Sequence, residues 1–104
     1  MRGPSVIGAY NVNKVADFQL ARNLAVELRP HNVRLNTIAP GLIKTEFART
    51  LWEYPERCAK QNSVVPLRRN GEPDEIVGAV VFLARKAGSF VTGNSIVVDV
   101  GATI

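Results

Sequence analysis

The chain has 104 residues, of which 46% are hydrophobic and 21% are charged. This is the composition of one small globular domain, and it excludes an intrinsically disordered chain. The net charge is +4, but the lysines and arginines are scattered and no basic run is interleaved with aromatic residues, so nucleic-acid binding is not expected.

The sequence also bears on the cellular setting of the protein. Cys58 is the single cysteine, so no intrachain disulfide can form and nothing marks an oxidising compartment. Because no histidine or second cysteine lies near it, we expect Cys58 to be packed or idle, and we expect no metal site. No apolar run approaches the roughly 20 residues that span a bilayer, and the apolar stretch in MRGPSVIGAY is too short for a signal peptide. We therefore expect a cytoplasmic or organelle-matrix protein that has no membrane partner.

The first predicted element in chain order is an amphipathic helix over residues 10–29. Apolar residues recur there at helical spacing while the charged residues lie mostly elsewhere. The apolar positions are Val15, Phe18, Ala21, Leu24, Ala25 and Leu28. Pro30 should end this helix. Residues 33–39, VRLNTIA, then predict a strand that ends at Pro40 and Gly41.

The second half of the chain predicts a flap, a long helix and a strand. From Thr45 onward weak helical periodicity is interrupted by Pro55, which predicts two short helices in a mobile flap. Residues 71–88, GEPDEIVGAVVFLARKAG, predict a helix with an acidic first turn, closed by Arg85 and Lys86 and stopped by Gly88. The apolar run NSIVVDV, residues 94–100, is typical of a strand covered on both faces in a parallel sheet.

The order of helix, strand, flap, helix and strand predicts an α/β fold. Two strands alone make a marginal sheet, because apolar strands need neighbours on their edges. We therefore interpret residues 1–104 as one unit, the C-terminal part of a larger doubly wound parallel sheet with two strands, two long helices and a short helical flap.

Tyr10 and Lys14 stand four residues apart at the head of the first predicted helix, where they share one face. A phenol titrates near pH ~10, and a neighbouring ammonium group lowers its pKa because it favours the phenolate. Such a pair can act as a general acid and base. The same spacing also fits a helix-end tyrosine beside a solvated lysine.

Four motifs, in order, resemble the C-terminal half of a short-chain dehydrogenase/reductase: YNVNK, VRLNTIAPGLIKT, PLRRNGEPDEIVGAVVFLA and VTGNSIVVDVG. The resemblance covers nearly the whole chain from about Ile7 onward. It implies a Rossmann fold and an oxidoreductase that interconverts a carbonyl and an alcohol with NAD or NADP. The stretches IGAYNVNK and APGLIKTEFARTLWE are most similar to the carbonyl and retinal reductase subgroup.

The resemblance also implies roles for particular residues. Tyr10 matches the catalytic acid/base, and Lys14 matches the lysine that binds the nicotinamide ribose and lowers the pKa of the tyrosine. The other matched positions form the cofactor side of the pocket: a turn that bounds the nicotinamide, backbone groups that face its carboxamide, and a hydroxyl that reaches the cofactor. In that order they are Pro40 with Gly41, Ile43 and Thr45.

The resemblance assigns residues 46–66 to the substrate-binding loop. There we expect Phe47, Leu51 and Trp52 to pack the flap against the body, with the lining of a substrate pocket as the alternative. Arg68 and Arg69 precede the GEP helix start, where a structural or solvated role is expected.

The sequence also departs from the pattern of the family. It contains no glycine-rich dinucleotide motif, Ser5 is too close to Tyr10 to be the catalytic serine, and Asp99 is followed by Val100 where the family usually has glycine. The chain alone is therefore expected to be inactive, since the pyrophosphate would lack an anion site and the oxyanion a donor. The alternative is a non-catalytic module that associates with full-length subunits through residues 77–83 and 95–100. The resemblance also implies a homo-oligomer.

Overall fold

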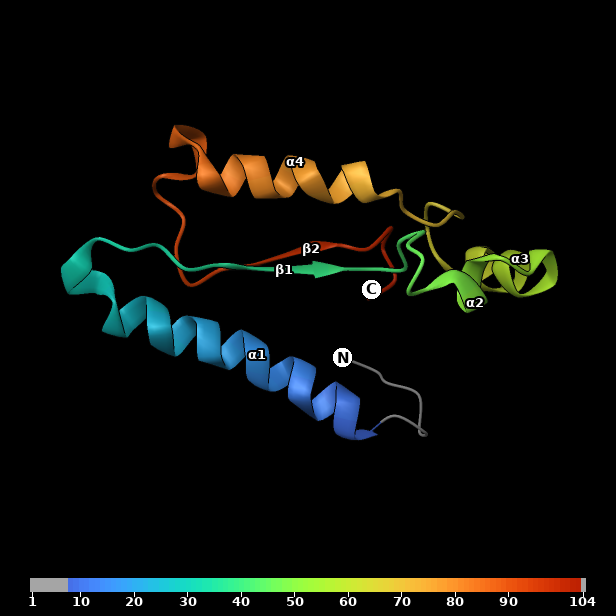
Figure 1. Ribbon diagram of the computed structural model, residues 1–104, viewed down its shortest axis with the longest axis horizontal. Coiled ribbons are helices and arrows are strands. Elements are labelled where there is room, and N and C mark those ends of the chain that lie inside the picture. The colour runs from blue at the N-terminus through green and yellow to red at the C-terminus, as the bar shows by residue number, and fades with distance from the viewer. Residues whose placement is uncertain (1–7, 104) are drawn as a thin grey trace. The chain divides into compact units, whose positions relative to one another are not determined.

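The computed structural model describes the backbone of residues 8–103 and the side chains of residues 12–103. The helices are α1 (Gly8–Glu27), α2 (Arg49–Trp52), α3 (Pro55–Val64) and α4 (Pro73–Ala84), and the strands are β1 (Thr37–Pro40) and β2 (Ser95–Val98), as Figure 1 shows. Two 3₁₀ turns, η1 (Arg29–His31) and η2 (Lys86–Gly88), follow α1 and α4. The order of helix, strand, two-helix flap, helix and strand confirms the sequence-based order.

The two strands pair directly with each other in one small sheet. The backbone N–H of Thr37 donates to the carbonyl of Asn94 at 2.9 Å, and that of Gly41 donates to the carbonyl of Val98 at 3.0 Å. Both strands therefore advance in the same direction, which is parallel pairing. A parallel pair needs a long crossover, and here the flap and α4 provide it. The predicted α/β class is confirmed.

The predicted strand over residues 33–39 is too long at its start, because β1 begins only at Thr37. The segment before it is held by side chains. The Nδ2 of Asn36 donates to the carbonyl of Val91 at 2.9 Å, and its Oδ1 accepts the N–H of Asn94 at 3.0 Å. The N–H of Leu35 donates to Oγ1 of Thr92. Such side-chain bonds replace a strand ladder.

The two long helices also end earlier than the sequence predicts. α1 ends at Glu27, and Pro30 lies inside the 3₁₀ turn that follows. α4 ends at Ala84, because the backbone of Arg85 is extended, with φ −87° and ψ 175°. Arg85 and Lys86 therefore lie beyond α4 and do not close its last turn. The N–H of Gly88 donates to the carbonyl of Arg85, so the predicted stop is a tight turn of its own.

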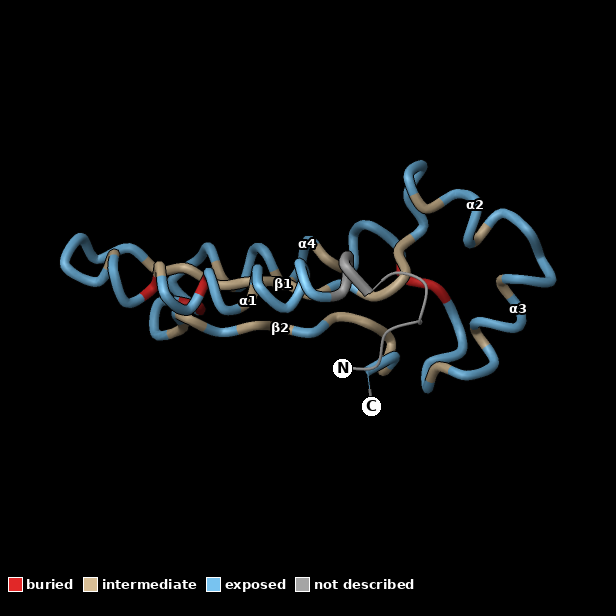
Figure 2. Tube along the Cα trace, turned by 90° about the horizontal axis from the view of Figure 1, so that it is seen from below, coloured by how far each residue is buried: buried red, intermediate tan, exposed pale blue. Residues whose placement is uncertain are grey.

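The chain forms two compact units, one of Met1–Thr37 with Phe82–Ile96 and the other of Ile38–Val81 with Val97–Ile104. Figure 2 marks the few buried residues of each unit. They are Ala21, Ala25 and Gly88 in the first unit and Asn70 and Gly71 in the second.

The predicted apolar face of α1 is therefore buried only at its alanines. Val15, on the same face, remains 53% exposed. Phe18 and Leu24 of the same face are half-buried.

Candidate functional site

The predicted acid–base pair lies on the first helix. Tyr10 and Lys14 both belong to α1, so they are about one helical turn apart. The side chain of Tyr10 lies outside the described residues. The Nζ of Lys14 lies 3.4 Å from Oδ2 of Asp17 in an exposed ion pair. The shared face and the catalytic roles of Tyr10 and Lys14 remain predictions.

The predicted cofactor wall starts where β1 ends. Pro40 is the last residue of β1, and Gly41 follows it with its N–H bonded to β2. A Cβ at Gly41 would lie 2.7 Å from the Cα of Asp99, closer than carbon atoms can approach. Only glycine fits this corner. The corner stands at the carboxyl end of a parallel strand, where α/β sheets bind their ligands.

Ile43 lies in a short parallel bridge with Gly71. The N–H of Gly71 donates to the carbonyl of Leu42, and the N–H of Lys44 donates to the carbonyl of Gly71, both at 2.9 Å. The carbonyl of Ile43 accepts the N–H of Thr45 at 2.8 Å. The structure thus brings Gly41, Ile43 and Thr45 into one continuous, hydrogen-bonded segment.

Thr45 is also linked to the flap. Its carbonyl accepts the indole N–H of Trp52 at 2.9 Å, and its Oγ1 accepts the N–H of Ala48 at 3.2 Å. A hydroxyl that accepts one bond still has its own proton to donate. Thr45 can therefore donate a hydrogen bond to a ligand while it caps the turn that leads into α2.

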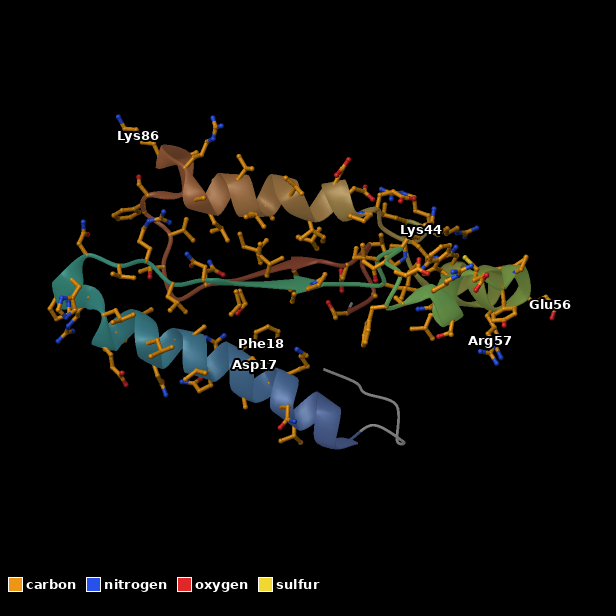
Figure 3. The ribbon with its side chains drawn as sticks, in the orientation of Figure 1. Asp17, Phe18, Lys44, Glu56, Arg57 and Lys86 are labelled. Carbon is orange, nitrogen blue, oxygen red and sulfur yellow. The ribbon has the colours of Figure 1, made fainter. Side chains whose placement is uncertain are left out.

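Charged side chains gather where the two ends of the flap meet the start of α4. Arg69 donates two hydrogen bonds to Glu75, at 2.6 and 2.7 Å, and Oε2 of Glu75 also accepts the backbone N–H of Glu72 at 2.8 Å. Lys44 pairs with Glu72, and Figure 3 labels Lys44 at this place. We call Lys44, Arg69, Glu72 and Glu75 the ion-pair cluster.

The hydrogen bonds from Arg69 lower the pKa of the Glu75 carboxyl to about 2, and the N–H of Glu72 adds to this effect. The structural role expected for Arg69 is therefore seen, whereas its pairing with Glu75 and the pairing of Lys44 with Glu72 were not predicted. An acidic residue at the third position of a helix, two residues after Pro73, is the sequence signal that predicts such a cap.

Asn70 joins the base of the flap to α3. It is only 4% exposed, and its Nδ2 donates to the Sγ of Cys58 at 3.1 Å. The Nδ2 of Asn62 donates to the same sulfur at 3.3 Å. Cys58 is therefore packed, and its sulfur accepts hydrogen bonds. Of the two roles expected for it, packed or idle, the structure shows the first.

The aromatic residues of the flap differ from the packing that the sequence predicts. Trp52 is half-buried against the turn at Thr45, but Phe47 is 100% exposed, so its predicted packing is wrong. The turn before α2 is closed by backbone and hydroxyl bonds to Thr45 and needs no contact from Phe47. Around the junction of α2 and α3 an open hollow of about 590 Å³ is lined by Thr50, Tyr54, Pro55, Glu56 and Arg57.

Arg57 lies over the ring of Tyr54, 5.6 Å from its centroid. Figure 3 shows Glu56 and Arg57 at the outer end of the flap. Among the side chains of residues 12–103 no cluster of metal-ligating groups is found. None of the helices described is long and apolar enough to cross a bilayer.

A family model and individual relatives both match nearly the whole chain. The sequence model of a family described as enoyl-(acyl carrier protein) reductase matches residues 2–103. Dehydrogenase/reductase SDR family member 4 from Bos taurus is 45% identical over 96 residues, which are 92% of this chain and 34% of that protein. Its counterpart from Mus musculus is 43% identical over 100 residues, 96% of this chain and 36% of the relative. The chain thus spans about a third of the length of these relatives.

Solved structures show the same likeness. A short-chain dehydrogenase/reductase from Mycobacterium ulcerans superposes with a TM-score of 0.83 at 40% identity, covering 90% of this chain and 34% of its own. A 4-hydroxyisoleucine dehydrogenase complexed with NADH gives a TM-score of 0.91 at 31% identity, covering 99% of this chain and 42% of its own.

Proposed function

Because this chain belongs to the short-chain dehydrogenase/reductase family of Rossmann-fold oxidoreductases, we propose that residues 1–104 form the C-terminal portion of its NAD(P)-binding domain. In this proposal the chain supplies the acid–base pair and one wall of the nicotinamide pocket to an enzyme that interconverts a small carbonyl compound and its alcohol. The observation that carries it is the glycine corner at the carboxyl end of β1, which continues into the hydrogen-bonded segment from Gly41 to Thr45.

The proposed chemistry divides between the cofactor and this chain. A bound nicotinamide would supply or accept the hydride. Tyr10 would give a proton to the carbonyl oxygen or remove one from the alcohol. Lys14 holds the nicotinamide ribose and favours the phenolate form of Tyr10 by its positive charge. The helical backbone of α1 supports this pairing, because it sets both residues about one turn apart.

The proposed wall uses backbone and hydroxyl groups. Pro40 and Gly41 form the corner that bounds the nicotinamide, and Gly41 is required there because a Cβ would clash with Asp99. Ile43 and Thr45 follow directly and offer backbone groups and a hydroxyl donor to the carboxamide side. A solved relative that was complexed with NADH supports the use of a nicotinamide cofactor, either NAD or NADP.

A chimera tests this function. Residues 2–103 would replace the matching segment of the Bos taurus relative, and oxidation of NADH and NADPH would be followed with a panel of ketones and aldehydes. We expect hydride transfer that Tyr10→Phe lowers by roughly 100- to 10,000-fold, the usual contribution of a general acid. Ser89→Ala removes an exposed hydroxyl outside the flap and should leave the rate unchanged. Full activity in Tyr10→Phe would refute the assignment.

A second candidate, association with a full-length subunit of the family without catalysis, is favoured by the exposed apolar residues of α4. Val77, Val80, Val81 and Phe82 are each more than 40% exposed. In this case the chain would co-purify with the full-length relative, and Tyr10→Phe would change nothing. The chimera and a co-purification experiment therefore separate the two candidates.

A further inference from the structure

The two ends of the flap are joined beside the first turn of α4. Leu42 and Lys44 hydrogen-bond with Gly71 on one side, and Arg69 reaches Glu75 on the other. All of these residues belong to the same compact unit. The segment that carries Ile43 and Thr45 is thus tied to α4 through only a few residues.

Glu75 makes the contacts that give this junction a fixed geometry. Its two oxygens accept a pair of parallel bonds from Arg69, and one of them also accepts the N–H of Glu72. A two-pronged guanidinium–carboxylate pair fixes orientation as well as distance. The side chains of Arg69 and Glu75 are 49% and 39% exposed, so water screens the pair and it adds little to global stability. The pair should therefore order the neighbouring backbone rather than stabilise the whole fold.

The local order passes along the backbone. Arg69 is followed directly by Asn70 and Gly71, and Gly71 is the residue that hydrogen-bonds with Leu42 and Lys44. A movement of Arg69 therefore shifts these backbone bonds. Lys44 is also paired with Glu72 at the start of α4. Thr45 comes next, and its carbonyl is the acceptor for the Trp52 indole. Trp52 is the single tryptophan of the chain, so it reports on this turn alone.

We propose that Arg69 and Glu75 are positioning residues that hold the backbone of Ile43 and Thr45 in the arrangement needed to face the nicotinamide. The cofactor part of this inference rests on the proposed function. The pair touches neither substrate nor cofactor, and it acts through the Gly71 bridge. Loss of the pair should loosen the wall of the pocket while the helices and the sheet remain folded.

The first test is spectroscopic and needs no cofactor. In two-dimensional ¹H–¹⁵N NMR spectra of the 104-residue chain, Trp52 gives a single indole signal. Glu75→Gln keeps an acceptor for the N–H of Glu72 but removes the ionic partner of Arg69. We expect the indole signal to move toward that of a free indole and the amides of Ile43 and Thr45 to shift.

The matched control is Glu56→Gln, in the exposed first turn of α3, where Glu56 makes no ion pair among the described side chains. It carries the same chemical change on the flap and should leave the indole signal in place. An unchanged indole signal in Glu75→Gln, or an equal change in both variants, would overturn the inference.

A second set of variants separates positioning from a failure to fold. Arg69→Met should shift the Trp52 indole signal as Glu75→Gln does, and the double variant should shift it no further than either single change, because both remove one interaction. Arg69→Lys keeps the positive charge but loses the two-pronged geometry of the guanidinium. Its indole signal should therefore lie between that of Arg69→Met and that of the unchanged chain. Far-ultraviolet circular dichroism should show the same helix content in all of them. Additive shifts would contradict the pair as the cause.

The last test uses the chimera that carries the proposed function. Glu75→Gln should raise KM for the nicotinamide cofactor severalfold while kcat at saturating cofactor changes less, whereas Glu27→Gln, at the exposed end of α1 and outside the flap, changes neither. A cofactor KM that stays constant while the indole signal moves would overturn the cofactor part of the inference. A chimera that transfers no hydride even with Arg69 and Glu75 intact would instead refute the proposed function, and the Trp52 measurement would still decide whether the pair orders this segment.

Discussion

At the scale of single residues, Val100 has an unusual backbone. Its φ is 56°, in the left-handed region, and Gly101 follows at φ 84°. A β-branched side chain is strained at such an angle. Oδ1 of Asp99 accepts the N–H of Gly101 and holds the turn. Asp99, Val100 and Gly101 thus form a turn although valine stands where the family usually has glycine.

The strain at Val100 can be measured by exchange for glycine. Val100→Gly loses side-chain contacts but also the strain of about 1–2 kcal/mol that an L-residue carries in this region. Val97→Gly, in the extended strand β2, loses side-chain contacts and gains nothing. We expect Val100→Gly to be more stable than Val97→Gly by about 1–2 kcal/mol in urea unfolding. Equal losses in the two variants would mean that the left-handed turn costs nothing.

The carboxyl of Glu75 gives a prediction about pH. Hydrogen bonds from Arg69, then the N–H of Glu72 and the charge of Lys44, lower its pKa from 4.5 to about 2. A lowered pKa in the folded state stabilises the fold above the pKa of the unfolded chain, and this stabilisation is lost as the pH falls through the folded value. Because water screens this exposed pair, the loss should be small: unfolding midpoints should drop slightly between pH 4.5 and 2, and Glu75→Gln should drop less, because its side chain does not titrate. Parallel pH profiles would show that Glu75 is not held by these partners.

At the scale of elements, Asn36 fixes the start of the parallel pair. Its side chain bonds to both Val91 and Asn94, which lie just before β2. Asn36→Ala removes a part-buried bond to the carbonyl of Val91 and an exposed bond from the N–H of Asn94, and each should cost about 0.5–1.5 kcal/mol in urea unfolding. Asn23→Ala removes an exposed bond to Gln19 on α1 and should cost nothing, since alanine favours the helix. Similar losses would contradict the special role of Asn36.

Periodicity predicted the helices and the flap because their signals are local. Apolar spacing placed α1 and α4, and Pro55 separated α2 from α3 by occupying the first position of α3. The start of β1 could not be found in this way. Residues 33–36 look like a strand, but their bonding partners lie more than fifty positions further along the chain, at Gly88, Val91 and Thr92.

In the candidate site, too, features that depend on local sequence were predictable and features that depend on distant partners were not. The Pro40–Gly41 corner was predictable because proline and glycine mark a turn after an apolar strand. The link from Arg69 to Glu75 and on to Ile43 was not, because it depends on which of many exposed charges meet in space. The roles proposed for Tyr10 and Lys14 came from the resemblance to the family, since their spacing alone left two readings open.

At the scale of the whole molecule, large apolar side chains are exposed on α1 and α4. They include Val12, Leu20 and Val26 on α1 and Val77, Val80 and Val81 on α4. Exposed apolar groups of this number favour association, because burying them releases water. We expect the chain to form oligomers in size-exclusion chromatography with light scattering.

A charge placed on α4 should weaken this association. Val80→Glu adds a carboxylate where an apolar side chain is 49% exposed and should shift the distribution toward the monomer. Gln61→Glu adds the same charge to the exposed surface of α3 and should leave the distribution unchanged. A monomer at all concentrations in the unchanged chain would contradict the prediction.

The bridge between Ile43 and Gly71 has a consequence for how such proteins diversify. It closes the flap into a loop whose two ends meet at fixed neighbours. Doubling the length of such a loop raises the entropic cost of closing it by only about 0.6 kcal/mol. Insertions, deletions and whole replacements between these two anchor points should therefore be tolerated by the rest of the fold. Flaps of different length and sequence can therefore stand between the same two anchor points without a change in the sheet.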